Sequence, residues 1–494
     1  MVAKSSNSPL RFFKNFSFLL GARIIDSMAQ LAVLPLVSRY LGSEKYGDYG
    51  FVMICCFITV CFTYAGLERI VLREIAKNPK QADEYLTNAL IIRWFYMLVS
   101  LAVITVIILL GNFSAKLIWC LYLAAFAWSF ASDSAIHISL YKAFEKMEYE
   151  AILVLSFQIS YLVFLFLVTY YNLGFTSIFI AFLIANMMKN FSAVLITRIK
   201  FTKFTFKIQW SLLKYFLKES YILGLIVILM QGFINVDLLV LKSSRMSVAA
   251  SMFYSSHNLI ILISVTATSV MSVLSPIFSR SANTDHNDLF GKYKQSFKIV
   301  TFVTFLLVIQ FMILSPLIIK TIFGSEFVNA IHSFQILVIC LIFTIPFTLF
   351  DIVLVSISKQ HLLFLCPLAG LIVRFVLDIF LIPTYGVVGA SVAAVSGYFV
   401  FFITGFYLIT VNLKQLDIHK IMLKPAIISL IIGIIVYQLR ESLPIYYLAV
   451  PATIGYFAFL YWIKFFSNDE IVFLKDFTHK ALPTVFISQQ IKKV

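Results

Sequence analysis

The chain has 494 residues, of which 61% are hydrophobic and 13% are charged. Soluble globular proteins are about 45–50% apolar, so this composition excludes an ordinary soluble enzyme or binding module and predicts a polytopic membrane protein. The formal net charge is +16. Positive loops that fix membrane topology explain this charge better than nucleic-acid binding does.

Apolar runs of about twenty residues, the length needed to cross the hydrocarbon core as a helix, recur along the whole chain. The predicted fold class is therefore an all-α polytopic membrane protein with about 14 transmembrane helices, arranged as two six-helix lobes plus two C-terminal helices. The expected spans are residues 15–38, 46–70, 87–110, 116–140, 151–171, 175–198, 220–243, 250–278, 297–319, 332–357, 362–382, 387–411, 421–440 and 446–466.

The distribution of positive charge predicts the orientation of these spans. With the N-terminus in the cytoplasm, 28 of the 39 Lys and Arg residues fall in or beside cytoplasmic loops and termini. Seven fall at or near the outside, so we expect both termini to be cytoplasmic. Residues 1–14 have no cleavable signal character, and the first helix is expected to be its own insertion signal. The six cysteines all lie in apolar runs and show neither a disulfide framework nor metal-ligand spacing, and no cofactor is expected.

A basic amphipathic segment divides the chain. In residues 199–219, lysines interleave with Phe, Trp and Leu, a pattern typical of a helix that lies flat on an anionic membrane surface. We therefore expect an N-terminal lobe at 1–198, this cytoplasmic linker, a C-terminal lobe at 220–411, two further spans within 412–466 and a cytoplasmic tail at 467–494. Repeated lobes of this kind are common in transporters.

Three glycine-containing turns interrupt the apolar runs. The first, Leu41–Ala76, reads LG-x₃-YG-x-Y, then a span that closes as G-L-x₅-RE. The second is Phe323–Phe327, and the third is Ile382–Ala390, which reads IP-x-YG-x-x-GA. Ser275-Pro276 adds a helix-end signal.

In their order and spacing, these motifs resemble Wzx-type polysaccharide flippases of the multidrug/oligosaccharidyl-lipid/polysaccharide exporter superfamily, over residues 15–410. The resemblance implies a bacterial inner-membrane protein that carries an undecaprenyl-pyrophosphate-linked oligosaccharide to the periplasmic leaflet for O-antigen or capsule synthesis. It also implies alternating access driven by an ion gradient, with a polysaccharide polymerase and a chain-length regulator as partners.

Ionisable residues inside spans are costly and mark functional positions or helix contacts. Two of them, Arg23 and Lys189, are cations in the middle third of their helices and are the candidate binding groups for an anionic substrate. Lys189 has Asn186 and Asn190 beside it, whereas Arg23 has Asp26 one turn away. Pairing of these cations with Asp133 or Asp237 is an equally good interpretation. Arg93 is expected to extend to the cytoplasmic surface.

The remaining intramembrane groups allow two interpretations. They are candidates for proton or cation coupling or, more simply, polar contacts between helices: Asp26, Asp133, His137, Asp237, His257 and Asp351. Arg374 and Asp378 are four residues apart on one helix face and are predicted to neutralise each other as a structural pair.

No nucleotide-binding, hydrolase or metalloprotease motif is present, so a non-enzymatic transporter is predicted. A drug or cation exporter and a lipid II flippase of the same superfamily remain open. A polysaccharide polymerase or ligase is a rival from another class. It would need a long external loop, and the longest expected one covers only about residues 320–331.

Overall fold

The computed structural model describes residues 9–64, 66–111, 113–201, 207–271, 274–439, 444–463 and 465. Of these, residues 9–20, 23–24, 58–64, 221–223, 276, 283–284 and 445–446 are described by their backbone only. Within these ranges the regular secondary structure is entirely helical, which confirms the all-α fold class. Ten helices among the described residues are long and apolar enough to cross a membrane.

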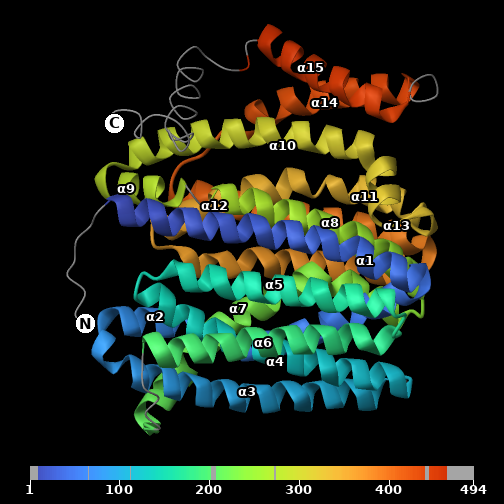
Figure 1. Cartoon of the computed structure of the whole chain (residues 1–494). Coiled ribbons are helices and arrows are strands. Elements are labelled where there is room, and N and C mark those ends of the chain that lie inside the picture. Colours follow the sequence, from blue (N-terminus) through green and yellow to red (C-terminus); the bar gives the residue numbers. More distant parts are fainter. Residues whose placement is uncertain are drawn as a thin grey trace, which may run out of the picture.

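The helices lie side by side along one common direction (Figure 1). They are α1 (Pro9–Tyr64), α2 (Leu67–Lys77), η1 (Pro79–Gln81), α3 (Ala82–Leu110), α4 (Ala115–Ala143), α5 (Met147–Tyr170), α6 (Phe175–Lys200), α7 (Trp210–Ser243), α8 (Ser247–Met271), α9 (Ser275–Thr284), α10 (His286–Ile322), η3 (Ser325–Phe327), α11 (Ala330–Val338), α12 (Leu341–Ser356), η4 (Gln360–Phe364), α13 (Leu365–Asn412), α14 (Ile418–Leu439) and α15 (Ile445–Trp462). We call α1–α6 the first lobe and α7–α13 the second lobe.

Helix α1 holds two crossings rather than one. Its 56 residues would extend about 84 Å at about 1.5 Å per residue, far beyond the hydrocarbon core of about 30 Å. The helix is interrupted at Gly42, where φ is 71° and ψ is 175°. Asp26 and Phe57, on opposite sides of Gly42 in sequence, line the same cavity, so the chain reverses at this glycine. A positive φ favours glycine because it has no Cβ.

Helix α13 folds back in the same way at Gly386, where φ is 54° and ψ is −126°. Arg374 precedes this glycine in sequence and Tyr398 follows it, yet the Arg374 guanidinium lies 5.3 Å from the centre of the Tyr398 ring. The glycine turns singled out in the sequence are therefore the reversal points of two helical hairpins. We call the end of the bundle that holds Gly42 and η3 the Gly42 end, and the opposite end, with α2 and α9, the α2 end (Figure 1).

The second span ends earlier than residue 70. Helix α1 stops at Tyr64, and Gly66 adopts a left-handed conformation with φ 65° and ψ 7°. The following α2 is a separate amphipathic helix. Its buried residues Leu67, Ile70 and Val71 pack with residues of α3, α4 and α7 in one apolar cluster.

The basic segment 199–219 does not lie flat as a separate linker over its described residues. Helix α7 begins at Trp210, so residues 210–219 are its first turns. Leu213 and Phe216 are buried in the apolar cluster with α2 and α3, whereas Lys214 and Lys218 are exposed. The predicted amphipathic pattern is present in residues 210–219, but its apolar side packs against the apolar residues of α2 and α3.

Helices α14 and α15 form an outer pair that packs on α10 (Figure 1). Gln310 of α10 donates hydrogen bonds to Ala449 O (3.2 Å) and Thr453 Oγ1 (2.8 Å). Tyr456 donates a hydrogen bond to Phe302 O (2.9 Å). These polar contacts within the apolar cluster orient the pair against the second lobe.

Candidate functional site

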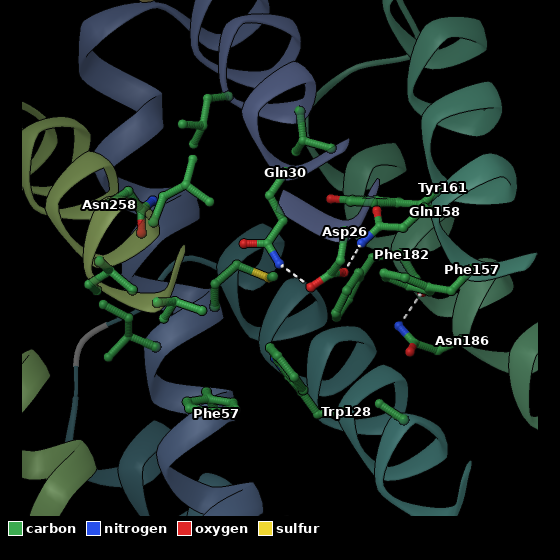
Figure 2. Close-up of a pocket in the computed structure, with 18 of the residues that line it drawn as sticks. Asp26, Gln30, Phe57, Trp128, Phe157, Gln158, Tyr161, Phe182, Asn186 and Asn258 are labelled. Carbon is green, nitrogen blue, oxygen red and sulfur yellow. Dashed lines mark hydrogen bonds between the residues drawn. The ribbon is translucent and has the colours of Figure 1, made fainter. Parts of the chain in front are cut away.

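A cavity of about 580 Å³ lies between the two lobes (Figure 2). Helices α1, α4, α5 and α6 of the first lobe form one wall, and α7 and α8 of the second lobe form the other. This volume is in the range of about 300–1,000 Å³ that is usual for small-molecule sites. A space shared by two lobes changes shape when the lobes move relative to each other.

Only two charged residues, Asp26 and Lys189, line this cavity among the described side chains, and both belong to the first lobe. Asp26 accepts hydrogen bonds from Gln30 Nε2 (3.0 Å) and from Gln158 Nε2, which joins α1 to α5 (Figure 2). The ammonium of Lys189 lies 5.6 Å from the centre of the Phe157 ring. The carboxylates of Asp26 and Glu150 both attract this ammonium electrostatically.

Of the two candidate cations predicted from the sequence, Arg23 and Lys189, the structure places the side chain of Lys189. Lys189 lines the cavity and pairs with neither Asp133 nor Asp237, because these carboxylates are bonded to Arg93 and Arg374. Arg23 lies on α1, one turn before Asp26, but its side chain is outside the described part of the structure. The binding roles of both cations remain predictions.

Amide side chains form most of the polar lining, and the sequence pattern points to only Asn186 among them. Their signal is an uncharged polar residue within an apolar run, which also suits an ordinary helix contact. Aromatic rings from both lobes complete the walls, among them Trp128, Tyr161 and Tyr254. The lining amides are Gln30, Gln158 and Asn186 of the first lobe and Gln231, Asn235 and Asn258 of the second.

Aromatic side chains from both lobes pack between the cavity and the Gly42 end. Tyr46 of α1 stacks on Tyr49 with ring centres 5.9 Å apart, and it contacts Tyr254 of α8 at 5.3 Å. Phe323 and Phe327 of the second lobe contact the same Tyr46 ring at 6.0 and 5.6 Å. These rings fill the space between the lobes.

Polar contacts reinforce this closure. Lys242 of α7 forms an ion pair with Asp48 of α1 and donates a hydrogen bond to Ser247 Oγ (2.9 Å). The Ser43 N–H donates a hydrogen bond to Glu326 Oε2 (3.0 Å) across the lobes. The two lobes are therefore joined at the Gly42 end in this conformation.

The expected pairing of Arg374 with Asp378 is wrong. Arg374 Nε donates to Asp237 Oδ1 (2.8 Å), and the second guanidinium nitrogen forms an ion pair with the other carboxylate oxygen. Arg374 Nη1 also donates to Phe233 O (2.7 Å), so α13 is tied to α7. Asp378 is fully buried beside this pair and its oxygens accept no hydrogen bond from a described residue. Spacing on one helix cannot reveal that another helix supplies the closer acid.

A second ion pair lies inside the first lobe. Arg93 is only 2% exposed and forms an ion pair with Asp133 (3.5 Å), so the expectation that it extends to the membrane surface is wrong. His137 of α4 contacts α6, where its Nδ1 lies 2.9 Å from Thr197 Oγ1. Because Asp133 and His137 do not line the cavity, they act as contacts between helices in this conformation.

The two remaining candidates also lie outside the cavity lining. His257 of α8 is buried and stacks on Phe253 with ring centres 5.2 Å apart. Asp351 of α12 is exposed. Asp26 is thus the one predicted acid that lines the cavity. The described side chains bring together no three His, Cys, Asp or Glu residues that could hold a metal ion.

Comparison with known proteins identifies the family. A model for polysaccharide biosynthesis proteins matches residues 12–282, more than half of the chain. The chain belongs to the polysaccharide biosynthesis protein family. A search of curated proteins found no match.

Solved structures of transporters share the fold of this family member. The lipid II flippase MurJ in an inward closed conformation has a TM-score of 0.72 and 18% identity, covering 93% of this chain and all of that one. An inward-facing multidrug resistance MATE family transporter of the MOP superfamily has a TM-score of 0.65 and 16% identity, with 80% and 98% covered. The eukaryotic MATE transporter AtDTX14 has a TM-score of 0.60 and 16% identity, with 84% and 99% covered. The chain therefore has the fold of MOP-superfamily flippases and transporters.

Proposed function

We propose that this protein translocates an undecaprenyl-pyrophosphate-linked oligosaccharide across the bacterial inner membrane for the synthesis of O-antigen or capsule. The observation that carries this proposal is the cavity between the lobes, whose largely apolar wall contains Lys189 and several amide side chains. The polysaccharide biosynthesis family and the flippase fold support it. A polysaccharide polymerase and a chain-length regulator are the proposed partners.

The proposed mechanism is alternating access. In this structure the lobes are joined at the Gly42 end by the Tyr46 aromatic cluster and by the Asp48–Lys242 ion pair. We take the Gly42 end to be periplasmic and the α2 end to be cytoplasmic, because the positive charge is concentrated near the latter. Rocking of the lobes would separate the Gly42-end contacts and open the cavity to the periplasm.

The anion-binding role falls to Lys189 and Arg23. A pyrophosphate that enters a site of low dielectric loses water and needs fixed positive charge nearby. Lys189 supplies a point charge that no bound carboxylate neutralises among the described residues. Arg23 would supply a planar fork of donors suited to phosphate oxygens.

Asp237 and Asp378 are the proposed coupling groups. Two buried carboxylates beside the single guanidinium of Arg374 carry one excess negative charge when both are ionised. A buried unpaired charge is costly, so a proton or small cation would bind there. The site joins α7 to α13, and its occupancy would therefore change the packing of the second lobe.

Lipid II transport is the second candidate, favoured by the structural similarity to MurJ. It uses the same anion chemistry and differs in the sugar. A drug or cation exporter fits less well, because a lysine in the cavity repels a cationic substrate. A polymerase or ligase is disfavoured by the turn at Phe323–Phe327, a 3-10 helix rather than an extended loop.

The test is restoration of surface polysaccharide in a strain that lacks its flippase, with the membrane level of each variant measured in parallel. We expect Lys189→Gln to reduce polymer at normal protein level, Arg23→Gln to abolish most of it and Arg23→Lys to retain part. Lys294→Gln changes an exposed lysine outside the cavity lining and serves as the control. Wild-type polymer from both Gln variants would refute the cationic site. Restoration of only a lipid II flippase-deficient strain would identify the second candidate.

A further inference from the structure

The second lobe contributes uncharged polar side chains, among aliphatic ones, to the cavity wall. Its lining residues from α7 and α8 include Gln231, Asn235 and Asn258 but no charged side chain, whereas Asp26 and Lys189 both lie in the first lobe. Figure 2 shows Asn258 on one side of the cavity and Gln158 and Asn186 on the other. A fully charged ligand would leave the second wall without a matching group.

Most of these amides bond within their own lobe rather than across the cavity. Gln30 and Gln158 both donate to Asp26 in the first lobe. In the second lobe, Asn235 Nδ2 donates to Gln231 O (3.0 Å) and to Gln231 Oε1 (3.2 Å). These bonds orient the side chains without joining the lobes, so the amides line the shared space.

Amide chemistry matches sugar hydroxyls. An amide side chain has two N–H donors and an acceptor oxygen, and a hydroxyl is both donor and acceptor. Asn186 uses its Nδ2 on Phe182 O (2.9 Å), which leaves the carbonyl oxygen for a ligand. The flat rings of Trp128, Tyr161 and Tyr254 supply apolar surface for a sugar face. A cavity of about 580 Å³ holds a few rings at most and leaves a polyprenyl chain outside.

We propose that the cavity recognises an uncharged, hydroxyl-rich glycan through amides of both lobes, separately from the anion contact at Lys189. The inference rests on the proposed function and specifies which residues bind the sugar. The amides are Gln30, Gln158 and Asn186 on one wall and Gln231, Asn235 and Asn258 on the other. A glycan bound to both walls contacts both lobes at the same time.

Gln231→Met is the sharpest variant. Met has the length of Gln but no amide, and Asn235 keeps its hydrogen bond to the Gln231 carbonyl oxygen. Asn235→Leu removes a second amide from the same wall. The matched control is Ile234→Leu, which changes an apolar residue that lines the cavity from the same helix.

The experiment measures binding to the full chain in lipid nanodiscs. The probes are farnesyl pyrophosphate without sugar and farnesyl pyrophosphate linked to glucose, galactose, N-acetylglucosamine or glucuronate. We expect at least one uncharged sugar to increase affinity over the bare pyrophosphate. Gln231→Met should then weaken that probe by about 3- to 10-fold, as expected for one neutral hydrogen bond, and leave the bare pyrophosphate unchanged. Lys189→Gln should weaken all probes, and Ile234→Leu should weaken none.

The other outcomes separate the inference from the function on which it rests. Equal affinity for sugar-free and sugar-linked probes, or an equal effect of Gln231→Met on both, overturns the glycan site and leaves the pyrophosphate contact intact. Tighter binding of glucuronate than of glucose overturns the uncharged class. If wild-type protein binds no pyrophosphate probe, the proposed function and the inference fail together.

Discussion

Arg374 on α13 and Asp237 on α7 form a bidentate ion pair in which neither side chain is exposed. The two residues lie 137 positions apart in sequence, and Arg374 also bonds to Phe233 O on α7. The rings of Phe233 and Tyr398 flank the guanidinium at 5.4 and 5.3 Å. Arg374 is therefore a polar anchor between two helices of the second lobe.

The first prediction concerns this anchor. Removing one partner of a buried ion pair leaves an unpaired charge and costs about 3–5 kcal/mol. We expect Arg374→Gln to lower the thermal midpoint of the detergent-solubilised protein strongly, because Asp237 and Asp378 lose their cation. Asp237→Asn should lower it less, because Asp378 remains beside Arg374. The double variant should lose less than the sum, because the two single changes break the same ion pair. Additive losses in this cycle would mean that the two side chains do not interact.

The second prediction concerns the contact between the lobes at Gly47. A Cβ added there would lie 2.6 Å from Ser247 O and 3.0 Å from Ser251 N, both backbone atoms of α8. Gly47→Ala should therefore push α1 away from α8 and weaken closure at the Gly42 end. The measurement is disulfide cross-linking of Ser43→Cys with Glu326→Cys in a background without native cysteines, because these positions touch across the lobes.

Gly433→Ala is the matched control, since a Cβ on that helical glycine meets nothing within 4 Å. We expect it to leave cross-linking and transport unchanged. Cross-linking as efficient in Gly47→Ala as in the control would show that α8 moves aside at no cost.

The third prediction concerns docking of α7 on α2. Glu74 accepts hydrogen bonds from Arg73 Nε (2.9 Å) and Tyr215 Oη (2.9 Å). Burial acts to raise the pKa of Glu74, but the bonds from Tyr215 and Arg73 and the charge of Lys77 outweigh it and lower that pKa below its ordinary 4.5. A carboxylate with a lowered pKa stabilises the fold above about pH 4.5, and this contribution is lost as the pH falls through the folded-state pKa.

Glu74→Gln should therefore lower the thermal midpoint at pH 7, by the equivalent of about 1 kcal/mol for bonds that are partly exposed. The difference from wild type should shrink when both are measured near pH 4. A difference that is constant with pH would show that the charge of Glu74 has no part in the docking.

The fourth prediction concerns orientation. Single cysteines at Lys80 and Asn172, both exposed, lie at the α2 end and the Gly42 end. The Asn172 turn is placed there by the hydrogen bond from Gly174 N–H to Tyr40 Oη (2.7 Å). In intact cells, a membrane-impermeant thiol reagent should label Asn172→Cys and should reach Lys80→Cys only after the membrane is opened. The reverse pattern would place the termini outside.

The sequence alone determined the features that depend on short stretches of chain. Hydropathy over about twenty residues predicted the helical crossings, since a spanning segment must satisfy its backbone polar groups internally. Glycines between apolar runs predicted the turns at Gly42 and Gly386. Lys189, in the middle third of its helix, does line the cavity.

The tertiary structure decided which polar groups meet. Arg374 pairs with Asp237 of α7 rather than with Asp378, and Arg93 pairs with Asp133 inside the first lobe. The lysine-rich segment continues into α7, where Leu213 and Phe216 pack on protein. Spacing along one helix shows which side chains share a face, but only the arrangement of helices determines the partner opposite that face. The amide lining could not be predicted from the sequence for the same reason, because its two walls come from helices that are distant in sequence.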